Sequence, residues 1–583
     1  MFFSLFYFFS NCCQNWDANL NSFYLFTNCG YFCFLIILKK MKYTVLIPDF
    51  NVSEIQISLE FKLKSEKTEL ILPSWRPGRY ELAGYFKNIG KVKLINSEGI
   101  TLIAISENKW FVSGDVGRDV FLKYSYQAVQ MDAGNSWLSW ENSILNPINF
   151  LICPMGHEYE KVEVSLDIPP GYQIETQLGT NTNRSWEVEC YFDVVDAPFF
   201  ISKTFDSVTF DVEGIEISII FMGVVEKTPP IFRDDISRFV KKQFEIFGEF
   251  PESSYRFLIY VPDYRFYHGV EHAGSTIIVL GDSEGLFDEK YEHLQRISSH
   301  EFFHMWNACK IKPKELYGFP FGEEVRFTTG WVLEGYTTYY GDLVLCRSQV
   351  FSSIWFIRQI QMWVQSHMDN PARLSVSLSE SSEMLWEYGY KKEKPQKVLS
   401  IYTEGALFSL VSHLLIIKTT DGKKTLDDVM REVWDRFGKV KKGYEAKDIL
   451  DIYSELIGEE KSTELFDMLI YGKNRFIDFI EDILPDFGIS MEFTDNPDQL
   501  KGYLGIWSEE NKVKWIWPES VASNYIETGD IIKDASFTEG GCILEILRND
   551  TAFNYSFEVA GSLYFKRVLL NDLGENRLRK IWI

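Results

Sequence analysis

The sequence has few of the features that mark a disulfide-rich, nucleic-acid-binding or repeat protein. Four of its nine cysteines lie in the first 33 residues, and the other five stand singly without CxxC spacing, which indicates reduced thiols and not a disulfide framework. The formal net charge of −24 disfavours a nucleic-acid partner, because phosphate backbones are bound by concentrated Lys and Arg. No internal repeat or low-complexity tract stands out.

Long apolar runs are also scarce. The run at residues 31–38 is too short to cross a bilayer, which takes about 20 residues. A secretory signal carries positive charge before its apolar run, whereas Lys39 and Lys40 follow it and no small-residue cleavage site comes after them. We therefore expect residues 1–40 to be an upstream extension, Met41 to begin the functional protein, and that protein to be cytoplasmic with no membrane partner. The alternative is a leader that makes the protein membrane-associated or exported.

The composition indicates several folded domains. At 583 residues the chain exceeds the size at which one core stops growing. Apolar residues make up 46% and aromatic residues 16% of the sequence, which is enough for large cores. From residue 43 to about 210 the apolar residues recur with period two, as in KVEVSLDI at 161–168. This alternation predicts a β-rich N-terminal domain over residues 41–212, which we expect to be a β-sandwich.

The period changes after EKTPP at 226–230. From there to about residue 485 most long segments show helical periodicity, except for two strand-like runs within residues 255–281. Short strands return in the last hundred residues. We therefore expect a multidomain α+β protein, in which a mainly α domain with a small sheet covers residues 213–485 and a β domain covers residues 486–583.

The segment HEFFHMWN at 300–307 carries the strongest chemical signal. Helical spacing of the apolar residues around it places His300 and His304 one turn apart on a shared face. Two imidazoles at this spacing can bind one Zn²⁺ ion, while Glu301 beside them can act as a general base toward water. The alternative interpretation is that these are two surface histidines on an ordinary helix and bind no metal.

A third metal ligand is available thirty residues later. Glu334 stands among apolar residues in the periodic segment TTGWVLEGYTTYYGDLVL, and burying such an acid is costly unless it is paired or binds metal. A catalytic zinc usually keeps three protein ligands. Without HEFFH upstream, a half-exposed glutamate would be the preferred interpretation.

A rival metal motif, HGVEH, lies at residues 268–272. It matches the inverted zinc motif H-x-x-E-H, which requires a helix. Here Gly269 interrupts the motif and strand-like runs flank it, so His268 and His272 are not expected to share a face. Glu271 then becomes available for another role.

These motifs together resemble the glycyl aminopeptidase family of gluzincin zinc metallopeptidases. The resemblance rests on HEFFHMWNACKIKP at 300–313, on WVLEGYTTYYGDLVL at 331–345, and on HGVEH just upstream of both. LPSWRPGRYEL at 72–82 is similar to that family's N-terminal W-x-P-G-x-Y signature. The matches occur in the family's order and spread over most of residues 41–583.

The resemblance implies a thermolysin-like catalytic domain with one zinc ion bound by His300, His304 and Glu334. It implies that Glu301 activates water and that Tyr402, in SIYTEGALFSL, donates a hydrogen bond to the oxyanion. Two departures are Glu404, where the family usually has Lys, and Lys310, where it often has Arg. The roles of Trp306 and Asn307 are not explained by two ligands and a base.

Substrate binding is implied for HGVEH. An aminopeptidase must hold a free α-ammonium group, and Glu271 on an edge strand supplies the opposite charge, with Gly269 beside it in the substrate-binding segment. A solvated loop acid is the alternative for Glu271, and a core tyrosine is the alternative for Tyr402. The family name alone implies a preference for a small N-terminal residue, Gly or Ala.

The last hundred residues resemble a divergent PDZ domain, with YLGI at 503–506, PESVA at 518–522 and GDII at 529–532. Such a domain binds peptide C-termini by strand addition, but a purely structural β module fits the sequence as well. The expected function is a zinc aminopeptidase acting on peptides with a free N-terminus. The alternative is a catalytically silent scaffold that binds peptides through its PDZ-like and β domains.

Overall fold

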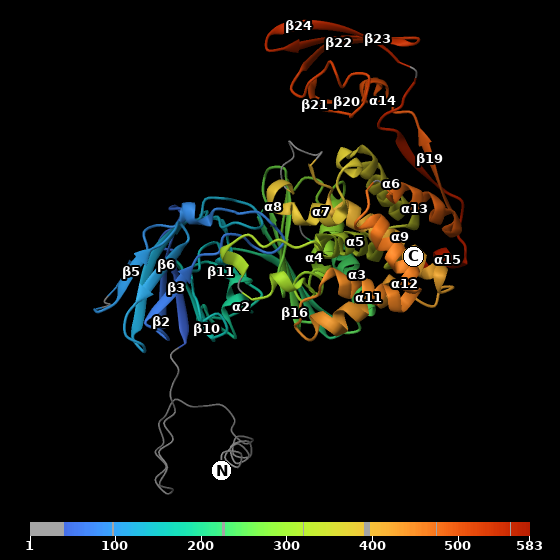
Figure 1. Ribbon diagram of the computed structural model, residues 1–583. Helices are drawn as coiled ribbons and strands as arrows, with labels where there is room; N and C mark the ends of the chain where they lie inside the picture. The colour runs from blue at the N-terminus through green and yellow to red at the C-terminus, as the bar shows by residue number, and fades with distance from the viewer. Residues whose placement is uncertain are drawn as a thin grey trace. The chain divides into compact units, whose positions relative to one another are not determined.

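The computed structural model of the protein describes residues 40–95, 98–223, 228–318, 320–389, 397–473, 475–559 and 561–583. The expectation for residues 1–40 therefore falls, apart from Lys40, outside the described residues. The coarse prediction of a multidomain α+β protein, with a β-rich region followed by a mainly helical part, is confirmed (Figure 1).

The N-terminal region is built from strands that alternate buried and exposed residues, as the period-two pattern predicts. In β1 (Met41–Leu46), Tyr43 and Val45 are buried while their neighbours are only partly covered. The larger sheet has the order β12-β10-β1-β2-β7-β4, with β12 Ser185–Val188, β10 Val162–Asp167, β2 Glu54–Lys62, β7 Asp119–Gln127 and β4 Lys93–Leu94. A second sheet has the order β5-β6-β3-β9, with β5 Thr101–Ala104, β6 Lys109–Ser113, β3 Lys67–Ile71 and β9 Cys153–Pro154. A third has the order β11-β13-β8, with β11 Gln173–Glu175, β13 Phe199–Ser202 and β8 Asn142–Leu145.

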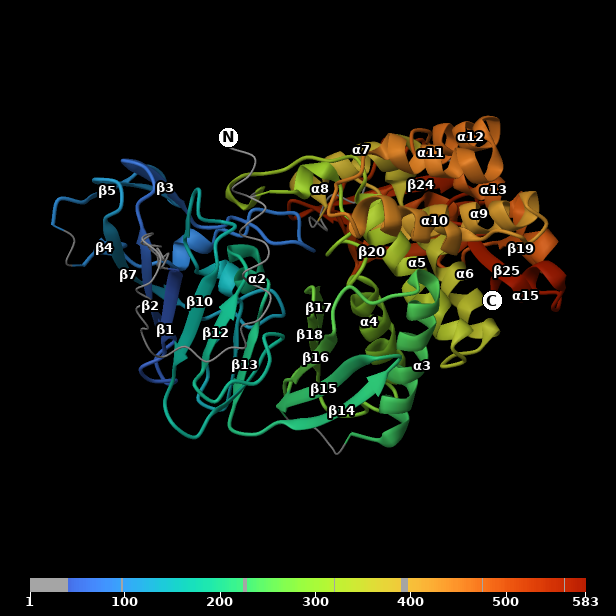
Figure 2. The ribbon, with the colours of Figure 1, turned by 90° about the horizontal axis from the view of Figure 1, so that it is seen from below.

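A five-stranded mixed sheet connects this region to the helices. Its order is β14-β15-β16-β18-β17, with β14 Asp206–Val212, β15 Ile215–Gly223, β16 Ser254–Val261, β18 Ser275–Gly281 and β17 Phe266–Glu271. The predicted domain boundary after residue 212 divides the β14–β15 hairpin, whose strands pair along their whole length. Strand β17 pairs only with β18 and forms the edge of the sheet, and Figure 2 shows α4 beside these strands.

The helical part surrounds one central helix, α9 (Ile401–Thr419). Among the described helices, α9 alone is long and apolar enough to cross a membrane, but 78% of its apolar stretch is buried inside the protein. Its packing in the core explains its composition. The helices around it are α3 Pro230–Phe247, α4 Tyr291–Phe303, α5 Tyr336–Arg347, α6 Ser353–Asp369, α7 Leu378–Glu383, α10 Leu426–Val433, α11 Ala446–Ile457, α12 Glu459–Leu469 and α13 Phe476–Ile483.

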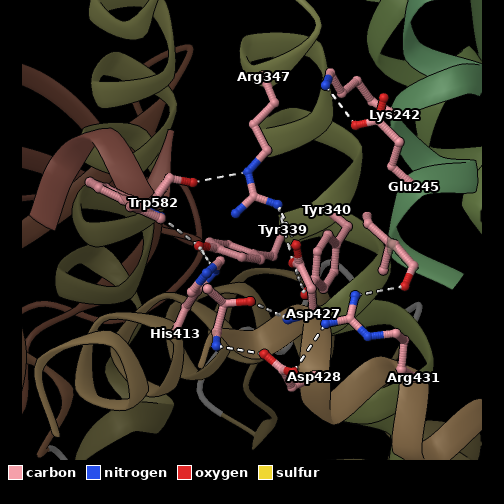
Figure 3. Close-up of polar contacts among 12 residues, drawn as sticks. Lys242, Glu245, Tyr339, Tyr340, Arg347, His413, Asp427, Asp428, Arg431 and Trp582 are labelled. Carbon is pink, nitrogen blue, oxygen red and sulfur yellow. Dashed lines mark hydrogen bonds and ion pairs between the residues drawn. The ribbon is translucent and has the colours of Figure 1, made fainter. Parts of the chain in front are cut away.

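The last helix, α15 (Arg577–Trp582), returns to this core (Figure 3). The Trp582 indole donates a hydrogen bond to the Tyr339 hydroxyl at 2.8 Å, and the Arg347 guanidinium donates to the Trp582 carbonyl at 2.9 Å. The Tyr339 hydroxyl also lies 2.9 Å from His413 Nδ1. The predicted boundary at residue 485 therefore assigns to the C-terminal domain a helix that belongs to the helical core.

The β-rich C-terminal segment contains two sheets. Strand β19 (Ile489–Thr494) pairs with β25 (Arg567–Asp572), and the backbone amides of Val568 and Leu570 donate to the side-chain oxygens of Gln365 and Gln361 on α6 at 2.8 and 2.9 Å. Between these strands lie α14 (Gln499–Leu504) and an antiparallel sheet in the order β20-β21-β22-β23-β24, with β20 Ile506–Glu509, β21 Lys512–Ile516, β22 Ile531–Thr538, β23 Gly541–Arg548 and β24 Thr551–Glu558. The PDZ-like assignment of this segment stays a prediction.

Candidate active site

Helix α4 presents the two histidines of HEFFH to a common point. The helix ends at Phe303 and His304 still has helical backbone angles, so the spacing of four places both rings on one face. The Nε2 atoms of His300 and His304 lie 3.2 Å apart. The Glu334 carboxylate oxygen Oε2 lies 3.7 Å from the first and 3.5 Å from the second.

Glu334 reaches this point from a π-helical turn, η5 (Trp331–Gly335), which runs directly into α5. Such turns leave carbonyl groups without their usual helical partners. The fully buried Asn307 amide donates to two of these carbonyls, Val332 at 2.8 Å and Leu333 at 2.9 Å. Asn307, which the sequence left unexplained, therefore ties the segment after HEFFH to the turn that carries Glu334.

Asn307 also orients one of the histidines. Its carbonyl lies 3.1 Å from His304 Nδ1, and because a carbonyl can only accept, Nδ1 carries the proton. The Nε2 lone pair of a neutral His304 then faces His300 and Glu334, as a metal ligand requires. Trp306 instead anchors the segment after α4, because its indole donates to the Glu249 carbonyl at 3.0 Å.

The donor triangle fits a zinc ion. With Zn–N distances of about 2.0–2.1 Å, two ligands of a tetrahedral ion lie about 3.3 Å apart, close to the observed 3.2, 3.5 and 3.7 Å edges. The charges of the site also favour a bound cation, because the Glu271, Glu301 and Glu334 carboxylates are all buried beside two imidazoles. Three buried carboxylates are costly unless a cation is present.

Two glycines allow α9, the helix that carries Tyr402, to pack closely against the η5 turn that carries Glu334. A Cβ on Gly335 would lie 2.3 Å from the Cα of Gly405, and a Cβ on Gly405 would lie 2.5 Å from the Cα of Gly335. The η5 turn and α9 can approach this closely only without side chains at the crossing. The Tyr402 ring, at the start of α9, lies 6.3 Å from the His300 ring between centroids.

The edge strand β17 forms the opposite wall. A Cβ on Gly269 would lie 2.2 Å from Glu301 Oε1, so only glycine allows the strand to approach the base of HEFFH. Glu271 ends the strand with 6% of its surface exposed, and its Oε1 has no hydrogen-bond partner among the described residues. The predicted strand context of HGVEH is confirmed.

A cleft of about 350 Å³ joins these parts. All seven residues predicted for the site line it: His300, Glu301, His304, Glu334, Glu271, Gly269 and Tyr402. Burial raises the pKa of Glu301 to about 8, and the charges of Glu271 and Glu334 add to this shift although the His304 charge opposes it. Glu301 therefore holds a proton more readily than an exposed glutamate.

The rival histidines do not form a metal site. His268 Nδ1 accepts from the Ala133 amide at 3.3 Å, whereas His272, which follows the end of β17, has its Nδ1 3.2 Å from an Asp196 oxygen. No group of metal-ligating residues among the described ones contains both.

The two departures from the family pattern have their own partners. The Glu404 carboxylate is buried and lies 2.6 Å from His367 Nδ1, so it belongs to an internal pair beside the cleft. Lys310 forms an ion pair with Glu252 at 2.5 Å. Neither residue lines the cleft.

Sequence reasoning missed two contributions to the cleft. Arg296, one turn before His300, forms a two-pronged hydrogen bond with Asp342 at 2.9 and 2.8 Å, and both residues line the cleft. Its position on the His300 face of α4 was a usable signal. Gly78, from the N-terminal region, also lines the cleft, and no local pattern connects it to residues so far away in the sequence.

Comparisons with known proteins agree with this geometry. The N-terminal domain model of peptidase family M61 matches residues 42–203, and the M61 glycyl aminopeptidase model matches residues 293–408. A search of curated proteins finds no match.

Solved structures share the fold. An aminopeptidase N family protein from Idiomarina loihiensis is 21% identical, with a TM-score of 0.85 over 93% of this chain and 100% of that one. A mutant M1 zinc metallopeptidase from Deinococcus radiodurans, bound to a Tyr-Ser-Ala substrate, is 13% identical, with a TM-score of 0.50 over 74% of this chain and 94% of that one. The chain therefore resembles the M61 family of peptidases in two separate segments, one matched by that family's N-terminal domain model and one by its glycyl aminopeptidase model.

Proposed function

We propose that the protein is a zinc-dependent aminopeptidase that removes small N-terminal residues, Gly or Ala, from peptides. The observation that carries the proposal is the arrangement of three buried carboxylates around two imidazoles in one cleft. Glu334 completes a metal-sized triangle with the two histidines. Glu301 stands beside the triangle as a base, and Glu271 lines the same cleft from the edge strand β17, where a substrate amine can bind.

His300, His304 and Glu334 would hold the zinc ion. When bound, zinc acts as a Lewis acid and makes water a stronger acid and nucleophile at neutral pH. Glu301 takes the proton from the attacking water and returns it to the leaving amine. The Tyr402 hydroxyl donates a hydrogen bond to the oxyanion of the tetrahedral intermediate.

The substrate is held from the opposite wall. The Glu271 carboxylate accepts hydrogen bonds from the α-ammonium group. The free edge of β17 offers backbone groups that align an extended peptide beside the strand. Binding the amine at one fixed distance from Glu301 selects the first peptide bond of the chain.

The test is hydrolysis of glycyl- and alanyl-anilides with and without a chelator, beside Glu301→Gln. We expect chelation to abolish activity, and the variant to keep its zinc and lose about 10²- to 10⁴-fold in kcat, the usual contribution of a general base. Glu292→Gln, on the same helix but outside the cleft, is the matched control and retains activity. Equal activity of wild type and Glu301→Gln refutes the mechanism, and an inactive, zinc-free wild type favours the peptide-binding scaffold.

N-acetylated substrates separate an aminopeptidase from an endopeptidase. Acetylation removes the charge that Glu271 binds, so we expect blocked glycyl-anilide to be a poor substrate. A preference for the blocked substrate leaves a metallopeptidase but removes the aminopeptidase assignment.

The C-terminal sheet receives a separate proposal, that it binds peptide C-termini as a PDZ-like domain. The edge position of β20 beside YLGI supports it, because strand addition needs a free edge. Titration with a fluorescent peptide, in free-acid and amidated forms, tests it. Binding that does not depend on the free carboxylate contradicts it.

A further inference from the structure

The N-terminal signature W-x-P-G-x-Y extends into the cleft although it lies in the β-rich region. Residues 75–80 form a turn in which Gly78 has a φ of +75° and lines the cleft together with Glu271. A Cβ on Gly78 would lie 2.1 Å from Glu271 Oε2 and 2.5 Å from Oε1. The backbone of this turn therefore lies directly against the carboxylate.

Contacts to the helical part hold the turn in place. The Ser74 amide donates to the Phe321 carbonyl at 2.6 Å, and the Trp75 indole donates to the Glu323 carbonyl at 2.9 Å. The Trp75 ring also meets the Trp386 ring edge-on at 5.2 Å, and the Tyr80 ring meets Phe327 at 5.0 Å. These buried aromatic contacts make the turn a rigid wall.

The same turn brings a cation behind the carboxylates. The buried Arg76 guanidinium donates to the Pro77 carbonyl at 2.9 Å, and a Cβ on Gly134 would lie 2.2 Å from its Nε. Its charge acts on both Glu271 and Glu301. The turn thus limits the position of Glu271 by contact and compensates its negative charge.

The Glu271 carboxylate is covered by Gly78 and still has an unpaired oxygen. Its Oε1 is buried without a hydrogen-bond partner among the described residues. Because unpaired buried carboxylate oxygens are costly, this oxygen is suited to receive a cationic donor from the substrate.

We propose that the turn at residues 75–80 is the back wall of the subsite for the substrate's α-ammonium group, and that Gly78 is the positioning residue that seats the Glu271 carboxylate. The inference rests on the proposed aminopeptidase function and adds to it a contribution from the N-terminal domain. The peptidase region alone would lack this wall.

The Gly78→Ala variant tests whether Gly78 positions the Glu271 carboxylate. Since real Cβ atoms stay about 3.0 Å or more from other atoms, and this one would stand at 2.1 Å, the carboxylate must move by about 0.9 Å. A misplacement of about 1 Å in an active site can cost about 100-fold. We expect such a loss in kcat/KM for glycyl-anilide, mainly as a higher KM, because the ammonium contact exists in ground and transition states alike.

Gly117→Ala is the matched control. Gly117 lies in the same domain with a φ of +87° and has no atom within 4 Å of an added Cβ, so it carries the same backbone strain without the contact. We expect its KM to stay within about twofold of wild type, since the strain affects stability alone.

Glu271→Asp supplies the second half of a double-mutant cycle. Aspartate withdraws the carboxylate by one methylene and leaves room for a Cβ at position 78. Gly78→Ala should therefore cost less than about threefold in the Glu271→Asp background, against about 100-fold in wild type. Equal losses in both backgrounds overturn the proposal, whereas an inactive wild type would overturn the proposed function instead.

Trp75→Phe is the second variant, needed if Gly78→Ala does not fold. It keeps an aromatic ring but removes the hydrogen bond to the Glu323 carbonyl, which loosens the turn without adding a side chain near Glu271. We expect KM for glycyl-anilide to rise by at least about fivefold with kcat nearly unchanged. An unchanged KM refutes the role of the turn.

Discussion

Asn307→Ala removes the side chain that connects HEFFH to the turn carrying Glu334. The amide donates to the Val332 and Leu333 carbonyls at 2.8 and 2.9 Å inside the protein. The Leu333 carbonyl keeps a hydrogen bond from the Thr337 hydroxyl at 2.7 Å, whereas the Val332 carbonyl loses its side-chain donor. A buried carbonyl without its donor costs about 1–3 kcal/mol, so the free energy of unfolding should fall by about 1–3 kcal/mol. Since partners that orient metal ligands are worth about 10- to 100-fold in metal affinity, the stabilisation that zinc adds should also shrink, by about 1.4–2.8 kcal/mol.

The assay compares denaturant unfolding of the chelated and zinc-loaded protein with zinc competition against a fluorescent indicator. Asn496→Ala is the control, because Asn496 is also buried, its amide donates to the Phe565 carbonyl at 2.7 Å, and neither residue lines the cleft. The control should lose stability without losing zinc affinity. If the two variants lose the same small amount of zinc affinity, Asn307 does not act through the metal ligands.

Three further predictions concern the helical core. Gly335→Ala should lower the free energy of unfolding by about 1–3 kcal/mol, because its Cβ would meet the Gly405 backbone at 2.3 Å; an unchanged denaturant midpoint would show that the crossing relaxes. Burial lowers the pKa of His413 to about 3, so stability falls as the pH drops below about 6.5 while the unfolded chain alone takes up the proton. His413→Gln should reduce that slope by about 1.4 kcal/mol per pH unit in melts from pH 6 to 4, and identical slopes contradict it. Trp582→Ala should cost about 3–5 kcal/mol, against almost nothing for the exposed Trp140→Ala, and similar losses in both would refute the anchoring of α15.

The local sequence pattern was sufficient to predict those parts of the site that lie within a single helix or strand. The spacing of His300 and His304 depends only on helix geometry, and the apolar surroundings of Glu334 indicated that it would be buried. The glycine in HGVEH and its strand-like flanks correctly placed Glu271 on a strand and not on a helix. In each case a few neighbouring residues contain the whole signal.

The remaining features depend on contacts between distant segments. Gly78 and Glu271 touch although they stand 271 − 78 = 193 positions apart, and no periodicity records such a pair. Period two identified β14 as a strand but could not say which sheet it joins. The π-helical turn at Glu334 likewise receives hydrogen bonds from Asn307, which lies in another segment of the chain.

The glutamines of α6 have a consequence for solubility. Strand β25 pairs with β19 on one side alone, and an open strand edge is a template for intermolecular pairing. Gln365 and Gln361 accept from the backbone amides of Val568 and Leu570 and so occupy donors on that open edge. A helix thus takes the place of a third strand, and replacing these two glutamines with alanine would expose a site from which aggregation can start.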